Sequence, residues 1–435
     1  MNTGQNLYVK AKKLIPGGTM LLSKRPEMFL PEKWPSYYSK ASGCHVWDLD
    51  GNKYTDVSIM GIGTNILGYG NKEIDEVVIN VVKSGNMSTF NCPEEVYLAE
   101  ELINMNPWAD MVRFARSGGE ANAIAIRIAR AASGRDKVAI CGYHGWHDWY
   151  LSTNLGNDNG LNQHLLPGLD PLGVPKSLKG SVFPFLYNDF EELENLVRNH
   201  DIGVIKMEVQ RNYPPKEGYL QRIRKLATDS NIVLIFDECT SGFRETYGPL
   251  FKKYNVEPDM TVFGKTIANG YALTAVVGKR EVMEAAQRTF ISSTFWTERI
   301  GPAAALKTLE VMRQLKPWDY ITEMGAYVIK NWTRIAKTHK LNINIFGIPS
   351  LAGFTLLSED TLKYKTLITQ EMLKKNYLAS TLLYSSLAHT TEIIDIYLNE
   401  LDNLFNTIRK CESKEINIDD ILEGPVCHGG FKRLN

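Results

Sequence analysis

Two apolar runs in the middle of the chain each lead to a residue that could take part in covalent or proton-transfer chemistry. The run 232–236 (Ile-Val-Leu-Ile-Phe) is followed by Asp237, and the run 261–263 (Thr-Val-Phe) leads through Gly264 to Lys265. A lysine amine can bond covalently to a carbonyl group and can then move a proton. Pyridoxal phosphate (PLP) needs such a lysine, and it needs a carboxylate that keeps its pyridine nitrogen protonated so that the ring acts as an electron sink. The pair therefore predicts that Lys265 carries PLP and that Asp237 faces the ring nitrogen.

Two other interpretations of this pair stay open. An apolar strand followed by Asp-Glu also resembles the Walker B segment of nucleotide-binding proteins, and Gly264-Lys265-Thr266 resembles the end of a P-loop. The P-loop pattern requires a glycine where this chain has Asp259, and here the lysine follows the Asp-Glu pair in an unusual order. An ordinary surface lysine is the remaining alternative, because lysines are mostly exposed.

A third candidate is the segment 116–121 (Arg-Ser-Gly-Gly-Glu-Ala), which lies between a predicted strand and a predicted helix. Small residues let backbone N–H groups approach a phosphate, and the start of the helix adds the positive end of its dipole. Glycine is also common in such turns for backbone reasons alone. No stretch of the chain matches G-x-G-x-x-G, which counts against a dinucleotide-binding fold.

A fourth candidate is the segment 141–147 (Cys-Gly-Tyr-His-Gly-Trp-His), at the end of another predicted strand. Tyr143 could cover one face of a ring-shaped cofactor. The two histidines could suggest a metal, but no further cysteine, histidine or acidic residue lies at ligand spacing. We therefore predict no metal site.

The elements that would position these residues alternate between short β-rich runs and helical periods, which favours an α/β fold with a mostly parallel, doubly wound sheet. Ligands of such sheets bind at the carboxyl ends of the strands. The predicted organisation is an N-terminal segment (1–59) that joins a small domain, a large domain (60–320), and a C-terminal small α+β domain (321–435). The predicted strands of the large domain are 111–115, 138–141, 204–207, 232–236, 261–263 and 273–278, and its predicted helices are 119–132, 190–199, 217–230 and 281–289.

Composition excludes several classes of protein. Lys plus Arg and Asp plus Glu number 49 each among 435 residues, so no net charge points to a nucleic-acid or membrane partner. Six scattered cysteines without a C-x-x-C motif indicate reduced thiols. The start of the chain has no secretory signal pattern, and no apolar run is long enough to span a membrane. We therefore expect a cytoplasmic enzyme.

Four motifs occur in one order over residues 117–265: Ser-Gly-Gly-Glu-Ala, Gly-Tyr-His-Gly, Asp-Glu-x-x-x-Gly-Phe-Arg and Pro-Asp-x-x-x-x-Gly-Lys. As a set, they resemble the class III (ω-type) PLP-dependent aminotransferases, and among these they are most similar to the glutamate-1-semialdehyde aminomutase branch. The resemblance extends over about residues 10–330. It implies PLP as the cofactor, a fold-type I PLP-dependent transferase, and a homodimer with its active sites at the subunit interface.

The resemblance also implies roles for single residues. Lys265 matches the lysine that binds the cofactor, Asp237 the partner of the pyridine nitrogen, and Tyr143 the aromatic residue that stacks on the ring. Cys239 would face the other side of the ring. Thr294 would bind the phosphate of the cofactor that is held by the partner subunit. The cofactor-binding residues that the resemblance implies are Ser117, Gly118, Gly119, Tyr143, His144, Glu208, Asp237, Cys239, Lys265 and Thr294.

Three departures from the family pattern lie where the substrate is expected. Gly119 replaces a threonine, so one hydroxyl contact to the phosphate is missing. The segment after Glu208 lacks the usual proline, and 297–299 reads Thr-Glu-Arg where Gly-Asn-Pro is usual. These changes favour an ordinary aminotransferase, which moves an amino group from an amino-acid donor to a keto or aldehyde acceptor. A PLP-dependent aminomutase or an amino-acid racemase or epimerase is the alternative, and a P-loop NTPase and a non-catalytic homologue are further ones.

The acceptor is a more distant hypothesis. Arg211 and Arg299 could hold a carboxylate or phosphate, and Trp296 lies in the same predicted region. We therefore list Arg211, Trp296 and Arg299 as candidate substrate residues, with a phosphorylated or sugar-like carbonyl of a surface-polysaccharide pathway as the candidate acceptor. The alternative is that the aromatic residues of this region only pack or contact a second subunit.

Overall fold

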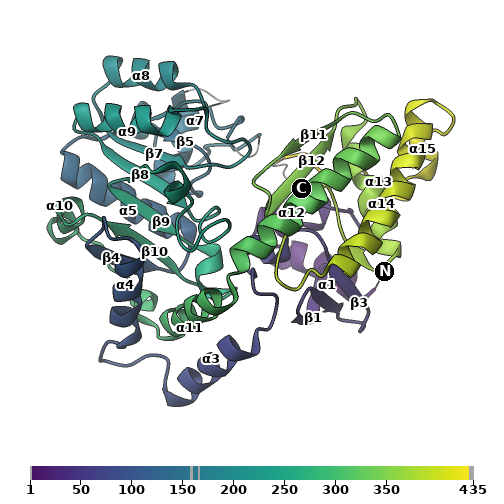
Figure 1. Ribbon diagram of the computed structural model, residues 1–435, viewed down its shortest axis with the longest axis horizontal. Helices are drawn as coiled ribbons and strands as arrows, with labels where there is room; N and C mark the ends of the chain where they lie inside the picture. Colours follow the sequence, from purple (N-terminus) through teal and green to yellow (C-terminus); the bar gives the residue numbers. More distant parts are fainter. Residues whose placement is uncertain (1, 157–159, 165–166, 431–435) are drawn as a thin grey trace. The chain divides into compact units, whose positions relative to one another are not determined.

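The computed structural model describes residues 2–156, 160–164 and 167–430, and it divides the chain into two compact units (Figure 1). The larger unit is Lys72–Trp318, and the smaller unit combines Met1–Asn71 with Asp319–Asn435. The predicted large domain began at residue 60, whereas residues 60–71 group with the smaller unit. Backbone hydrogen bonds explain this difference, because Gly43 bridges Tyr69 and Leu387 donates to Ile66.

The larger unit is built on a seven-stranded sheet in the order β4-β10-β9-β8-β7-β5-β6. Strands β9, β8, β7, β5 and β6 run parallel, and β10 is antiparallel to both of its neighbours. The prediction of a mostly parallel sheet is therefore confirmed. The strands are β4 (Met111–Ala115), β5 (Lys137–Cys141), β6 (Val182–Pro184), β7 (Ile202–Glu208), β8 (Val233–Glu238), β9 (Met260–Phe263) and β10 (Thr274–Gly278).

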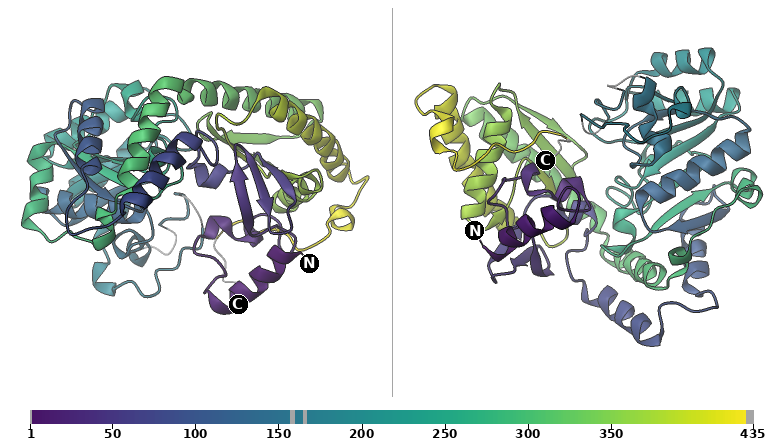
Figure 2. Two further views of the ribbon diagram at one scale, coloured as in Figure 1. Left: turned by 90° about the horizontal axis from the view of Figure 1, so that it is seen from below. Right: turned by 180° about the vertical axis from the view of Figure 1, so that it is seen from behind.

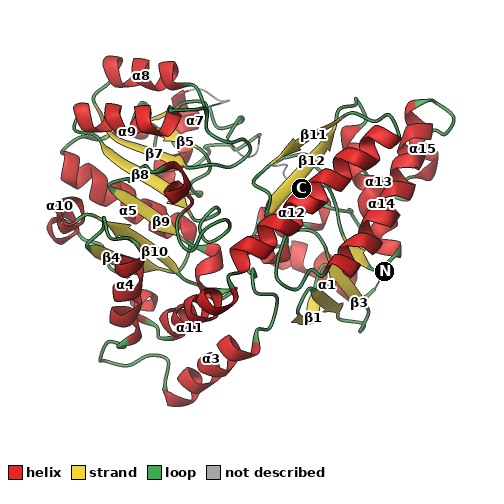
Figure 3. Cartoon of the chain, viewed as in Figure 1, coloured by secondary structure: helices red, strands yellow, loops and turns green. Residues whose placement is uncertain are grey.

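Helices cover both faces of this sheet (Figure 3). Every residue of β8 is buried, with Val233 and Ile235 in one apolar cluster and Leu234 and Phe236 in another. The first cluster includes α5, which runs across the sheet in the rear view of Figure 2, and the second includes α8 and α9. Burial on both faces explains why the strands read as continuous apolar runs. The helices are α3 (Lys72–Ser84), α4 (Glu94–Met105), α5 (Gly118–Ser133), α6 (Asp148–Leu151), α7 (Thr153–Gly156), α8 (Phe190–Asn199), α9 (Tyr219–Asp229), α10 (Arg280–Met283) and α11 (Ile300–Leu315).

Two local predictions in this unit were wrong. The short strand β6 was not predicted, because its three residues carry little periodic signal and end in Pro184. The segment 281–289, predicted as one helix, is α10 followed by the 3₁₀ helix η6 (Glu284–Arg288).

The smaller unit contains a four-stranded sheet in the order β1-β2-β3-β13 and a three-stranded antiparallel sheet in the order β11-β12-β14. Strands β2 and β3 form an antiparallel hairpin whose turn includes Asp50. The core of the unit is formed around Trp332, Phe354 and Phe405. Its elements are α1 (Thr3–Leu14), β1 (Tyr38–Ser42), β2 (His45–Asp48), β3 (Lys53–Asp56), α2 (Met60–Gly63), α12 (Pro317–Thr338), β11 (Ile343–Phe346), β12 (Leu351–Leu356), α13 (Thr361–Lys374), β13 (Tyr377–Leu378), β14 (Leu382–Tyr384), α14 (Thr391–Glu412) and α15 (Ile418–Ile421). Across the described parts of both units, no helix has the length and apolar character needed to cross a membrane.

Candidate active site

The carboxyl ends of β7, β8 and β9 meet at one edge of the parallel sheet. The register places Glu208 beside Asp237 and Glu238 beside Phe263, and Lys265 follows the end of β9. Because parallel strands point the same way, residues that are distant in sequence are gathered at this edge. The whole candidate site described below belongs to the larger unit.

Asp237 is the electrostatic centre of this edge. Its Oδ2 atom lies 2.8 Å from Nδ1 of His144 and 3.7 Å from Nζ of Lys206, and its Oδ1 accepts a 3.1 Å hydrogen bond from the backbone N–H of Cys239. Burial by itself raises the pKa of Asp237, but the Lys206 ammonium and the hydrogen bond to His144 outweigh burial and hold the pKa well below its ordinary value. The site therefore keeps a permanent negative charge in a buried place.

His144 fixes the direction of that charge. Its side chain is fully buried and stacks on Trp149, with ring centroids 6.5 Å apart. Burial lowers the pKa of His144 despite the nearby carboxylate, so we assign a neutral ring that donates its Nδ1 hydrogen to Asp237. The backbone is held as well, because Asn122 of α5 donates a 3.1 Å hydrogen bond to the carbonyl of His144.

Lys265 lies in a strained backbone position at the end of β9. Its φ angle is 42°, in the left-handed region that costs a non-glycine residue ~1–3 kcal/mol and is found most often at functional sites. Its Nζ donates a 2.7 Å hydrogen bond to Oγ1 of Thr240. Burial first, and then the positive charge of Arg211, lowers the pKa of Lys265 to about 8. Lys265 is therefore only partly exposed and carries an amine of lowered pKa, which argues against an ordinary surface lysine.

Glu208 and Arg211 form an ion pair next to Lys265. Nη1 of Arg211 lies 2.9 Å from both carboxylate oxygens of Glu208. Oε2 of Glu208 also accepts a 3.1 Å hydrogen bond from the backbone N–H of Tyr143. This carboxylate explains Gly142, whose φ is positive and whose added Cβ would lie 2.6 Å from Oε2.

Tyr143 and Cys239 follow the carboxyl ends of β5 and β8 at the same edge of the sheet. The Tyr143 ring meets Tyr150 edge-on, with centroids 5.9 Å apart, and burial raises its pKa. Sγ of Cys239 lies 3.7 Å from the position of an added Cβ on Gly118 and 3.1 Å from that on Gly264. Burial raises the pKa of Cys239 well above its ordinary value, so its thiol stays protonated.

The turn before α5 is organised by a capping box. Ser117 is the N-cap, and its backbone N–H donates a 2.8 Å hydrogen bond to Oε2 of Glu120 while its hydroxyl accepts from the Glu120 backbone. Gly118 and Gly119 form the first turn of a helix that continues for 16 residues. Their N–H groups lie at the positive end of the helix dipole, which suits an anion.

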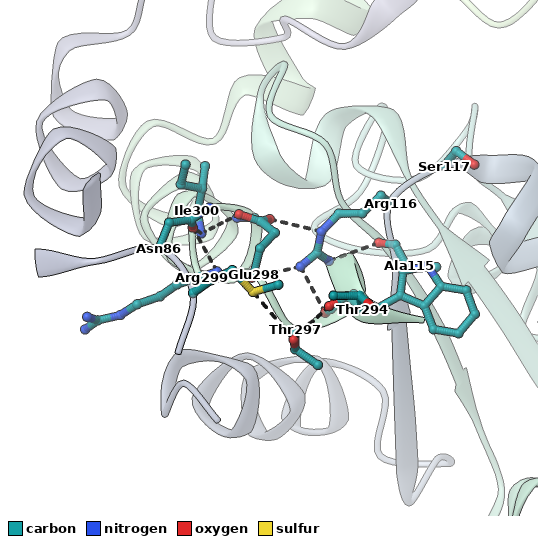
Figure 4. Close-up of polar contacts among 12 residues, drawn as sticks. Asn86, Ala115, Arg116, Ser117, Thr294, Thr297, Glu298, Arg299 and Ile300 are labelled. Carbon is teal, nitrogen blue, oxygen red and sulfur yellow. Dashed lines mark hydrogen bonds and ion pairs between the residues drawn. The ribbon is translucent and has the colours of Figure 1, made fainter. Parts of the chain in front are cut away.

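Arg116 connects this turn to the segment 294–299 (Figure 4). Its guanidinium donates to the carbonyls of Trp296 and Glu298, at 3.0 and 2.8 Å, and its Nε lies 2.9 Å from the Glu298 carboxylate. Glu298 also accepts from the N–H groups that begin α11. The indole of Trp296 donates a 3.2 Å hydrogen bond to Glu120. These contacts connect the turn at 116–120 firmly to the segment 294–299.

Of the predicted residues, the structure brings most to this edge and leaves two apart from it. Thr294 is exposed on the surface of the larger unit. Arg299 points away from Arg116 and Ser117 in Figure 4, and its guanidinium makes three hydrogen bonds of 2.7–3.0 Å to the Glu94 carboxylate. Arg299 therefore lies with Glu94 of α4, on the side of the segment that faces away from the turn 116–117.

Lys206 and Thr240 were missed by the sequence analysis. Lys206 left one detectable signal, because it is the only charged residue within the run Ile202–Met207 of a strand that is buried throughout. Thr240 left none, since a threonine after a strand is unremarkable and its contact with Lys265 depends on the tertiary structure.

Comparisons with known proteins identify the family to which the sequence is similar and the fold that it shares. A family model described as aminotransferase class-III matches residues 31–381. A 3-aminobutyryl-CoA aminotransferase from Cloacimonas acidaminovorans (strain Evry) is 34% identical over 84% of this chain and 86% of its own length. A glutamate-1-semialdehyde 2,1-aminomutase from Methanothrix thermoacetophila is 33% identical over 81% of each chain. The solved PLP internal aldimine form of the FumI protein from Sphingopyxis sp. MTA144 shares the fold, with a TM-score of 0.85 at 24% identity over 97% of this chain and 100% of that one.

Proposed function

This chain belongs to the aminotransferase class-III family, and on that premise we propose that it is a PLP-dependent aminotransferase whose Lys265 and Asp237 hold the reactive part of the cofactor. The observation that carries the proposal is the pairing of a buried, ionised carboxylate with a partly buried lysine of lowered pKa at neighbouring strand ends. A structural ion pair would bring two opposite charges together, whereas here the charge of Asp237 is compensated by Lys206 and the Lys265 amine binds Thr240. That separation leaves each group available for a ligand.

The residues at this edge fit PLP. Asp237, kept negative by Lys206 and oriented by His144, suits a protonated pyridine nitrogen. Tyr143 and Cys239 would hold the ring, and the N–H groups of Gly118 and Gly119 at the start of α5 would hold the phosphate. Bound there, PLP would supply the electron sink that stabilises negative charge at Cα of an amine substrate.

Lys265 would serve as the base of the reaction. A pKa of about 8 leaves a useful fraction of its amine neutral near physiological pH, so Nζ can accept the proton from Cα of the substrate and return it. Thr240 holds Nζ in place through its hydroxyl. Glu208 balances the charge of Arg211 beside it.

The substrate would be an anion. Arg211 is close enough to Lys265 to lower its pKa, so a carboxylate or phosphate that binds Arg211 would place its amino or carbonyl carbon near the reacting amine. On binding, the ion pair between Arg211 and Glu208 would be replaced by an ion pair between Arg211 and the substrate anion. No contact among the described residues selects a sugar-like or nucleotide-linked acceptor over a simple keto acid, so the negative charge alone defines the acceptor class.

A second copy of the chain is the proposed partner of the larger unit. Phe295, next to Thr294, is exposed. In the same segment, Oγ1 of Thr297 lies 3.7 Å from Sδ of Met87. Met87 is close in sequence to Phe90, which is also exposed, so the two segments form one surface. Exposed aromatic residues on adjoining segments are typical of a surface covered by another protein. In a homodimer, Thr294 would then be available to the other subunit's site.

The experiment compares Lys265→Ala with Lys279→Ala, since Lys279 is bound to Asp259 away from the site. Wild-type protein should show a PLP absorption band that a donor amino acid removes, with release of the matching keto acid. Lys265→Ala should lose the amine-sensitive band and nearly all turnover, whereas Lys279→Ala should keep both. Full turnover by Lys265→Ala would overturn the proposal. Isomerisation of the amine without use of an acceptor would favour an aminomutase or racemase instead.

A further inference from the structure

Gly119 is not required by the backbone conformation at its position. It lies in the first turn of α5 without a positive φ angle, and an ordinary residue would favour the helix by up to ~1 kcal/mol. A Cβ on this residue, however, would lie 2.7 Å from Cε1 and 2.8 Å from Nδ1 of His147. The glycine is therefore explained by the imidazole ring beside it.

The His147 ring packs against Trp146, with centroids 4.6 Å apart, but this contact does not explain its Nδ1 atom. His147 precedes α6 in the N-cap position, but its side chain makes no capping hydrogen bond. Its Nδ1 atom is buried and has no hydrogen-bond partner among the residues that the structure describes. An unsatisfied buried ring nitrogen costs ~1–3 kcal/mol, so such a group calls for a ligand.

The position of this nitrogen identifies the ligand chemistry. The Nδ1–Cε1 edge occupies the space that a side chain on residue 119 would fill, at the turn whose free N–H groups belong to Gly118 and Gly119. Burial lowers the pKa of His147, so the ring is neutral and Nδ1 can carry the one hydrogen that it donates. In the sequence, this is the place where the threonine hydroxyl of the family motif is missing.

We propose that His147 is a phosphate ligand of the cofactor, with its Nδ1–H group replacing the hydroxyl that Gly119 cannot supply. The proposal rests on the proposed function, because it assumes that PLP binds at this turn. A phosphate anion accepts hydrogen bonds strongly, and a donor that is held by close contact with Gly119 needs little reordering on binding. The absence of a side chain on Gly119 thus leaves the space that the His147 ring occupies.

The test compares the affinity of the protein for PLP with its affinity for pyridoxal, which lacks the phosphate. The cofactor is first removed from the full-length protein with an amine. Each compound is then titrated and followed by absorbance and tryptophan fluorescence. The variants are His147→Ala, His147→Asn and the double variant Gly119→Thr with His147→Ala. His147→Ala should weaken PLP binding by about tenfold to a hundredfold and leave pyridoxal binding unchanged within about twofold, as expected for one hydrogen bond to a charged group. His147→Asn, whose amide nitrogen can take the place of Nδ1, should keep most of the PLP affinity.

The double variant should regain PLP affinity, because the threonine restores a hydroxyl once the ring no longer blocks it. Gly119→Thr alone should weaken the binding of PLP because of the clash with His147. Equal losses of PLP and pyridoxal affinity in His147→Ala would show a packing role and overturn the inference, and so would unchanged affinities. A wild-type protein that binds neither compound would instead overturn the proposed function.

Discussion

Lys206 and Asp237, neighbours on adjacent parallel strands, lie 3.7 Å apart with side chains that are 0% and 3% exposed. Lys206 makes no hydrogen bond to any described residue, so its contribution to the site is its charge. A buried ammonium is costly unless a negative charge balances it, and a buried carboxylate has the same requirement. The pair thus keeps Asp237 ionised while its other contacts orient it.

Lys206→Met should destabilise the protein by about 3–5 kcal/mol, because Asp237 would then lack a buried counter-charge. The double variant with Asp237→Asn should recover part of that loss, since neither charge remains. Urea unfolding of the wild type, the two single variants and the double variant gives the coupling energy. Additive losses would show that the pair is not coupled.

Asp237→Asn should lower the turnover of amino transfer by roughly 100-fold to 1000-fold, the usual effect of removing one preorganised electrostatic partner of a reacting group. Asp259→Asn is a matched control, because Asp259 is also buried and bound to two cations, Arg224 and Lys279, but lies at the opposite ends of the strands. The control should lose stability and keep turnover per folded molecule. Comparable losses of turnover in both variants would contradict the assigned role.

Covalent capture of an aldehyde by Lys265 should depend on pH with a midpoint near 8. Below about 8 the amine is protonated and unreactive, and above it the neutral form predominates, so capture should increase as the pH rises. The rate of PLP uptake between pH 6 and about 10, followed by absorbance, measures this midpoint. Thr240→Val should shift it further down, because the hydroxyl accepts a hydrogen bond that favours the ammonium form. A midpoint near the ordinary lysine value would contradict the burial of this amine.

Arg116→Met should loosen the segment 294–299, because it removes an ion pair and two backbone contacts at once. Hydrogen exchange of this segment should report a decrease of about 1–3 kcal/mol in its opening free energy. Arg299→Met is the control, since it breaks only the pair with Glu94 and leaves the Arg116 contacts intact. If both variants exchanged equally fast, Arg116 would have no special role in this segment.

Much of the candidate site could be predicted from the sequence. Asp237 and Lys265 follow apolar runs directly, and the rule that ligands bind at the carboxyl ends of parallel strands places them at one edge without coordinates. Arg211 and Arg299 were both predicted as ligands of a carboxylate or phosphate. The structure places Arg211 near Lys265, whereas Arg299 is bound to Glu94. The two arginines look alike in sequence, but Arg211 pairs with Glu208 on the same stretch of chain, whereas Arg299 binds Glu94 of the distant helix α4.

The sequence by itself determined most strands of the larger unit, their buried character and the two residues on which the proposed chemistry rests, because apolar periodicity and side-chain type are local properties. The tertiary structure alone decided which cation balances Asp237, which hydroxyl holds Lys265, and which side chain fills the space beside Gly119. Each of these contacts joins residues from different strand ends or loops. Their energies depend on burial and on angstrom-scale distances, which arise only when the sheet brings those ends together.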